Sequence, residues 1–187
     1  MPTNDQHSQI QEYTKSLDRA LLCICKAQLV RKGNIQLQDG APANAVLLPD
    51  FVPVVAKHHI FHIEVSQYFG FAEGRLTTLG YIYQLHTDVS KVDGGMDEIM
   101  GFHWHPAVGV KNPHLHVNSD HAALNPLTFR KMHIPTERLA LEDFIEFLIT
   151  QLHVKPERED WESILAENRK AFIDKRSWPK AGATFSV

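Results

Sequence analysis

"HWHPAVGVKNPHLH", residues 103–116, contains four of the 12 histidines of this chain. If its two ends pair as the arms of an antiparallel hairpin, the centred register sets His105 opposite His114 and His103 opposite His116. Side chains alternate between the faces of a strand, so this register also gathers an apolar opposite face from Phe102, Trp104, Leu115 and Val117. A shift of one residue would mix the two faces. The stretch therefore predicts a hairpin with one imidazole face and one core face.

Alternating segments flank this hairpin on both sides. "HHIFHIEVS" (58–66) and "GYIYQLHTD" (80–88) alternate in the period of two that is typical of strands, and "FRKMHI" (129–134) is long enough for a further short strand. "KVDGGMDE" (91–98) has the glycine and aspartate content of a turn. We expect an antiparallel meander of about 4–5 strands over about 58–134.

Helical patterns occupy the two ends of the chain. Apolar residues recur at helical spacing over about 8–32, and Gly33 then follows as a stop signal. Two further amphipathic patterns cover about 139–176. The segment 34–53 reads as turn residues around one short apolar run. The sequence predicts an α+β fold, a single domain over 1–187 in which an N-terminal helix and two C-terminal helices pack on one face of the sheet.

Composition excludes several classes of protein. The chain has 187 residues, 43% of them hydrophobic and 22% charged, which is the composition of an ordinary globular protein. A formal net charge of -3 argues against a protein that coats nucleic acid by bulk electrostatics. Cys23 and Cys25 lie two residues apart in a helical pattern, so they are not expected to pair. With no apolar run of signal-peptide or membrane-spanning type, we expect a cytoplasmic location and no membrane partner.

The imidazole face suits acid–base chemistry on a phosphate. One histidine can remove a proton from a nucleophile while a second delivers a proton to the leaving group, because the unperturbed pKa of imidazole lies near neutrality. Our first hypothesis is a hydrolase or nuclease that cleaves a phosphodiester, with RNA as a candidate substrate. Its expected catalytic residues are His103, His105, His114 and His116.

The same four histidines, His103, His105, His114 and His116, also have the spacing of a metal site. Zn²⁺ or another divalent ion that favours imidazole would serve either as a catalytic or as a structural ion. Histidine ligands usually donate their second nitrogen to a carboxylate or a carbonyl, and the hairpin contains no acidic residue, so that partner must come from elsewhere. A solvated histidine face without chemistry is the third interpretation.

Residues outside the hairpin are candidates to join it. "TFRKMHIPTERL" (128–139) brings His133 and Arg138 near in sequence, and both could stabilise charge on a phosphate. Whether His62, Glu64, His86 and Asn118 join the site is left open by the sequence. The chain has no P-loop, no Gly-x-Ser-x-Gly and no His-Glu-x-x-His motif.

Two loose resemblances follow from these motifs. The two His-x-His pairs followed by "HIPTERLALEDFIEFLI" (133–149) resemble a group of small uncharacterised prokaryotic proteins that share this order. The order "YIYQL", "GFHWHP", "PHLHV" is similar to the toxin component of TumE-type toxin-antitoxin pairs, which implies a role in such a pair. A non-enzymatic interaction module, such as an antitoxin or immunity partner that binds another protein, is therefore the remaining hypothesis.

Overall fold

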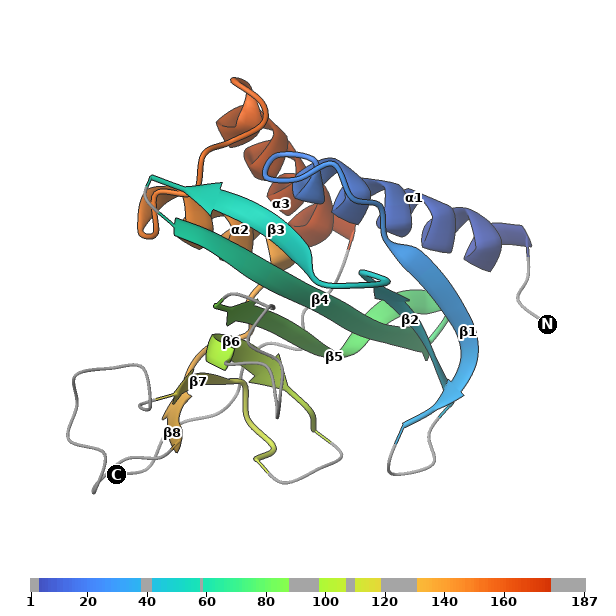
Figure 1. The fold of residues 1–187 in the computed structure, drawn as a ribbon. Coiled ribbons are helices and arrows are strands. Elements are labelled where there is room, and N and C mark those ends of the chain that lie inside the picture. The colour runs from blue at the N-terminus through green and yellow to red at the C-terminus, as the bar shows by residue number, and fades with distance from the viewer. Residues whose placement is uncertain are drawn as a thin grey trace.

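A computed structural model describes residues 4–37, 42–57, 59–87, 98–106, 110–118 and 131–175 of the chain. Three helices and eight strands form within these ranges (Figure 1). Their bounds are α1 Asn4–Leu21, β1 Val30–Gln36, β2 Pro42–Leu47, β3 Val52–Ala56, β4 His59–Ala72, β5 Arg75–His86, β6 Glu98–Trp104, β7 His114–Asn118, β8 Lys131–Pro135, α2 Leu141–Thr150 and α3 Trp161–Lys175.

The strands form one antiparallel sheet in the order β1-β2-β4-β5-β6-β7-β8, and β3 pairs with β4 off this path. β4 has 14 residues, which is long enough for both β2 and β3 to pair along it. From β4 to β8 each strand pairs with the next one in the chain. The predicted meander is thus present, and it places the hairpin strands β6 and β7 between β5 and β8.

The three helices pack against one another on one side of the sheet, where the apolar face of the strands is buried (Figure 1). The α+β prediction, with one N-terminal helix and two C-terminal helices, is confirmed. Phe144 of α2 is fully buried, and its ring stacks on that of Tyr83 at a centroid distance of 5.5 Å. Tyr83 stacks in turn on Tyr81 at 4.8 Å. This aromatic column joins α2 to the strand next to β6.

Tyr81 and Tyr83 keep their hydroxyl groups satisfied inside this core. The backbone N–H of Leu139 donates to the Tyr81 hydroxyl at 2.9 Å, and the Tyr83 hydroxyl donates to Oε1 of Gln67 at 3.2 Å. Burial raises the pKa of Tyr81 to about 12. Tyr81 therefore fixes β5 to the segment that leads into α2, and Tyr83 fixes β5 to β4.

The N-terminal helix is shorter at its C-terminal end than predicted. It ends at Leu21, and the predicted continuation to residue 32 is wrong because β1 begins at Val30. Tertiary contacts override the helical spacing here. The carboxylate of Asp18 accepts the backbone N–H of Leu29 at 2.8 Å, and the carbonyl of Cys23 accepts the N–H of Glu157 at 2.8 Å. These hydrogen bonds hold the segment between α1 and β1, in which the chain leaves the helix and enters the sheet.

The sheet contains more strands than the predicted 4–5. β2 lies wholly, and β1 and β3 in part, in the segment 34–53 that we interpreted as mainly turns, because its proline, glycine and asparagine residues obscure the alternation. Pro53 lies inside β3, a strand that pairs only with β4 among the described strands. An edge strand tolerates proline because one side of its backbone forms no ladder.

The register of the histidine hairpin differs by two residues from the prediction. His103 pairs with His114, and Gly101 pairs with His116, so the predicted pairs of His105 with His114 and His103 with His116 are wrong. A slip of two residues preserves the faces, since side chains alternate with a period of two. Phe102, Trp104 and Leu115 still lie on the core side.

Neither cysteine forms a disulfide. Cys23 and Cys25 are both buried and free, as the sequence predicted. Within the described ranges, every helix is too short or too polar to cross a membrane.

The aromatic column predicts a measurable stability effect. Phe144→Ala should lower the free energy of unfolding by about 3–5 kcal/mol, because it removes a fully buried ring and leaves a cavity between α2 and β5. Urea unfolding followed by circular dichroism measures this change. Leu22→Ala, at a position that is 36% exposed, is the control and should cost less than about 1 kcal/mol. Equal losses in the two variants would contradict the packing described here.

Candidate metal centre

Cross-strand registers arrange the polar side of the sheet in rows. One row runs from Glu64 through Gln84 and Gly101 to His116, and a backbone pair extends it to His133 on β8. The neighbouring row contains Ser66, Ile82, His103 and His114. The row on the other side contains His62, His86 and Glu98. The registers therefore collect polar residues from four strands onto the face opposite the helices.

Three histidines of this face form a tight buried cluster. His103, His114 and His116 are 6%, 3% and 7% exposed. The ring centroid of His116 lies 4.0 Å from that of His103 and 4.7 Å from that of His114. One candidate ligand nitrogen from each ring lies within 4.8 Å of the other two. This is the spacing at which three imidazoles can bind one ion.

The contacts of the outer nitrogens determine which nitrogens face the centre. Nδ1 of His114 lies 2.8 Å from the carbonyl oxygen of Asn112, which can only accept, so we assign the proton to Nδ1. Nδ1 of His116 lies 3.6 Å from Oε1 of Glu98. The two Nε2 atoms lie 2.8 Å apart, a distance at which they can share one proton in a hydrogen bond or, once both are deprotonated, contribute to one metal site.

Zn²⁺ fits this arrangement after a small adjustment. Nitrogen ligands 2.0–2.1 Å from a tetrahedral ion are roughly 3.4 Å from each other, so the two Nε2 atoms would separate by roughly 0.6 Å. Nε2 of His103 lies 2.9 Å from the amide nitrogen of Gln84, which must turn away if this nitrogen is the one that binds the ion. His114 and His116 thus each have an oxygen atom near the outer ring nitrogen, as histidine ligands usually do. These oxygens are the carbonyl of Asn112 and the carboxylate of Glu98.

Glu98 is the acidic partner that the hairpin lacks. Its Oε1 lies 3.9 Å from Nε2 of His103 as well as 3.6 Å from His116. Simple alternation along β6 would place residue 98 on the opposite face from residue 103. The register shift between Leu85 and His86 is a bulge that brings Glu98 opposite His86 on the polar face. A bulge leaves no clear sequence signal, so the sequence analysis missed this residue.

Gly101 makes space for the cluster, and the sequence analysis missed it as well. A Cβ at this position would lie 2.6 Å from Nε2 of His103, 2.8 Å from Cγ of Gln84 and 3.0 Å from Oε1 of Glu98. All three distances are shorter than a normal contact. The absent side chain is therefore what allows these polar groups to meet above β6.

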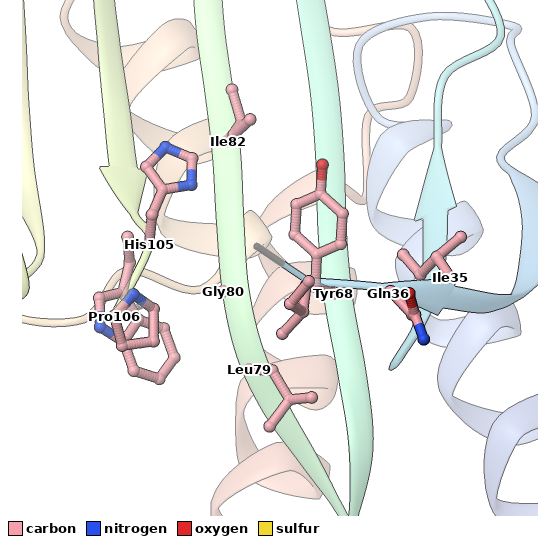
Figure 2. Close-up of a pocket in the computed structure, with 10 residues that line it drawn as sticks. Ile35, Gln36, Tyr68, Leu79, Gly80, Ile82, His105 and Pro106 are labelled. Carbon is pink, nitrogen blue, oxygen red and sulfur yellow. The ribbon is translucent and has the colours of Figure 1, made fainter. Parts of the chain in front are cut away.

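A pocket of about 240 Å³ opens beside the cluster. Figure 2 shows Tyr68 and His105 on either side of β5, with Gly80 between them. His105 also lies next to the cluster, since its ring centroid is 5.4 Å from that of His103. Burial, followed by the charge of His114, lowers the pKa of His105. The fourth histidine of the hairpin thus lies at the boundary between the cluster and the pocket.

The structure places the other predicted site residues as follows. The guanidinium of Arg138 lies 3.7 Å above the ring of Trp104, whose side chain packs with Tyr81 on the core side of the sheet. Arg138 is thus held against Trp104, which also lines the pocket, and its predicted role on phosphate stays a prediction. The side chains of His133 and Asn118 lie outside the described parts of the structure, although their backbones pair in β8 and β7.

His62, Glu64 and His86 lie on the same face of the sheet as the cluster. Glu64 belongs to the row of His116, and His62 and His86 belong to the adjacent row. Nε2 of His86 lies 3.9 Å from Oε2 of Glu64. The sequence left their participation open because it does not reveal which strands are neighbours.

No family model, curated protein or solved structure matches the chain. The candidate site is therefore argued from its geometry alone.

Gly101 provides a test of the cluster geometry. Gly101→Ala should weaken Zn²⁺ binding by at least about tenfold, because the added methyl group displaces His103 and Glu98. Isothermal titration with ZnCl₂ measures the affinity. Gly33→Ala is a matched control on β1, where a Cβ would meet only Oδ1 of Asn44 at 3.4 Å, and it should bind as the wild type does. Unchanged affinity in Gly101→Ala would contradict the proposed position of the ion.

Proposed function

We propose that this protein is a metal-dependent hydrolase, and that His103, His114 and His116 hold a zinc-type divalent ion that activates water for attack on a phosphodiester. The observation that carries the proposal is the contact between the Nε2 atoms of His114 and His116, which are 2.8 Å apart while their outer nitrogens face Asn112 and Glu98. These two nitrogens can share a proton, and a metal ion that displaces this proton would bind both of them.

Burial favours a metal over direct acid–base catalysis by the same rings. A general acid or base must contact the proton that it transfers, within hydrogen-bond distance. His103, His114 and His116 are each less than 8% exposed and turn their nitrogens toward one another. An ion at their centre can present a fourth position to a substrate, whereas the buried rings themselves cannot reach one.

The chemistry of such a centre is well defined. Three imidazole ligands leave one position for water, and Zn²⁺ lowers the pKa of bound water to about 7. The residues of the chain have the remaining tasks. Asn112 and Glu98 lie near the outer nitrogens of His114 and His116, Gln84 lies against the ring of His103, and His105 borders the pocket in which a substrate would lie.

The pocket supports a nucleotide-like phosphodiester as substrate. Tyr68 and His105 present two flat rings across the side-chain-free position of Gly80 (Figure 2). Flat aromatic rings stack on the bases of single-stranded RNA, which have an exposed π-face. A base between these rings would place the adjoining phosphate next to His103, since the rings of His105 and His103 are in contact.

Removal of one ligand tests the proposal. His114→Ala and His116→Ala should abolish the zinc bound by this centre and lower hydrolysis of bis-p-nitrophenyl phosphate or single-stranded RNA by at least about 10²-fold. Elemental analysis of untagged protein measures the metal, and a chromogenic or fluorescent assay measures turnover. His7→Ala and His59→Ala, at exposed positions, are matched controls that should keep both metal and activity.

The two measurements separate the parts of the proposal. Wild-type protein that holds no metal above trace and shows no thermal shift with Zn²⁺ would overturn the metal centre. Stoichiometric zinc without cleavage of either substrate would overturn the hydrolase and leave a structural ion.

A further inference from the structure

A second polar group adjoins the three-histidine cluster on the same face. His62 and His86 are paired residues of β4 and β5, and Glu64 follows His62 by two positions on the same side of β4. His86 also pairs with Glu98 of β6. The group therefore spans three neighbouring strands and meets the first cluster at Glu98.

His86 is the distinctive member of this group. It is only 4% exposed, and neither ring nitrogen has a hydrogen-bond partner within the described parts of the chain. Its Nε2 lies 3.9 Å from Oε2 of Glu64, which is too long for a hydrogen bond. The ring of Phe51 covers it edge-on at a centroid distance of 4.9 Å. Buried polar atoms in native proteins nearly always have a partner, so this ring is placed to bind something.

The surroundings of His86 favour a cation as that partner. Nδ1 of His62 is also buried without a hydrogen-bond partner in the described structure. Burial, and then the negative charge of Glu98, raise the pKa of Glu64, which shows that the two carboxylates share a poorly solvated region. Two carboxylates and two imidazole rings are ligands that Zn²⁺ and Mn²⁺ accept. A divalent ion would satisfy the nitrogens and neutralise the carboxylates together.

We propose that His86 and Glu64, assisted by His62, form a second divalent-cation site, and that Glu98 is shared between this site and the three-histidine centre. The proposal rests on the metal centre described above and extends it to a pair of ions. Two-metal sites are typical of enzymes that cleave phosphate esters, where the two ions stabilise the attacking and the leaving oxygen. A pair of ions would thus accord with the phosphodiester substrate proposed above.

Metal counting on the untagged full-length protein tests this second site. The protein is stripped with chelator, equilibrated with ZnCl₂ and analysed for zinc per chain. Wild type should hold about two equivalents, and His86→Phe and Glu64→Gln should each hold about one. His86→Phe keeps a ring against Phe51, and Glu64→Gln keeps the shape of the side chain, so the second variant serves if the first does not fold. His59→Phe and Glu73→Gln, at exposed positions, are matched controls that should hold about two.

The outcomes distinguish the two proposals. One equivalent in the wild type, lost in His114→Ala but kept in Glu64→Gln, would overturn the second site and leave the first intact. Two equivalents retained by both His86→Phe and Glu64→Gln would also overturn it. Absence of zinc from the wild type would overturn both sites.

Discussion

Strand β6 is buried on both of its faces, and the polar face must therefore satisfy its own hydrogen-bonding groups. On the core side, the ring of Phe102 packs edge-on against Phe144 and Phe147 of α2. On the other side, His103 meets two buried rings from β7. Little water reaches these imidazoles, and their nitrogens contact Gln84, the carbonyl of Asn112 and one another. The position of β6 in the sheet thus gathers three imidazoles where a metal ion could be bound.

Sequence patterns determined the faces of the hairpin but not its register. Alternation excludes a slip of one residue, yet it is indifferent to a slip of two, so the predicted partner of His105 proved to be the partner of His103. The chosen register also depends on contacts beyond the hairpin. Pro113 is held by a bond from the N–H of Thr136 to its carbonyl oxygen, and β8 pairs along the whole of β7. Such non-local contacts leave no trace in a local pattern.

The residues that complete the site were hidden for different physical reasons. Glu98 reaches the polar face through a bulge, which breaks the alternation on which the sequence analysis relied. Gly101 matters because it lacks a side chain, and nothing in its neighbours in sequence shows what its Cβ would touch. Proximity along the chain did not reveal that the guanidinium of Arg138 lies over the ring of Trp104, and its role on phosphate stays a prediction. The histidines themselves could be predicted, because their alternate spacing and the chemistry of imidazole indicate the same site.

The central claim is that one ring nitrogen from each of His103, His114 and His116 converges on one metal ion. X-ray absorption at the zinc edge, recorded on chelator-stripped protein loaded with a single equivalent of Zn²⁺, tests it most directly. The account predicts a first shell dominated by imidazole nitrogens at about 2.0 Å, with outer-shell scattering from about three rings that decreases in His114→Ala. A shell of oxygen alone, or a spectrum that is unchanged in His114→Ala, would contradict it.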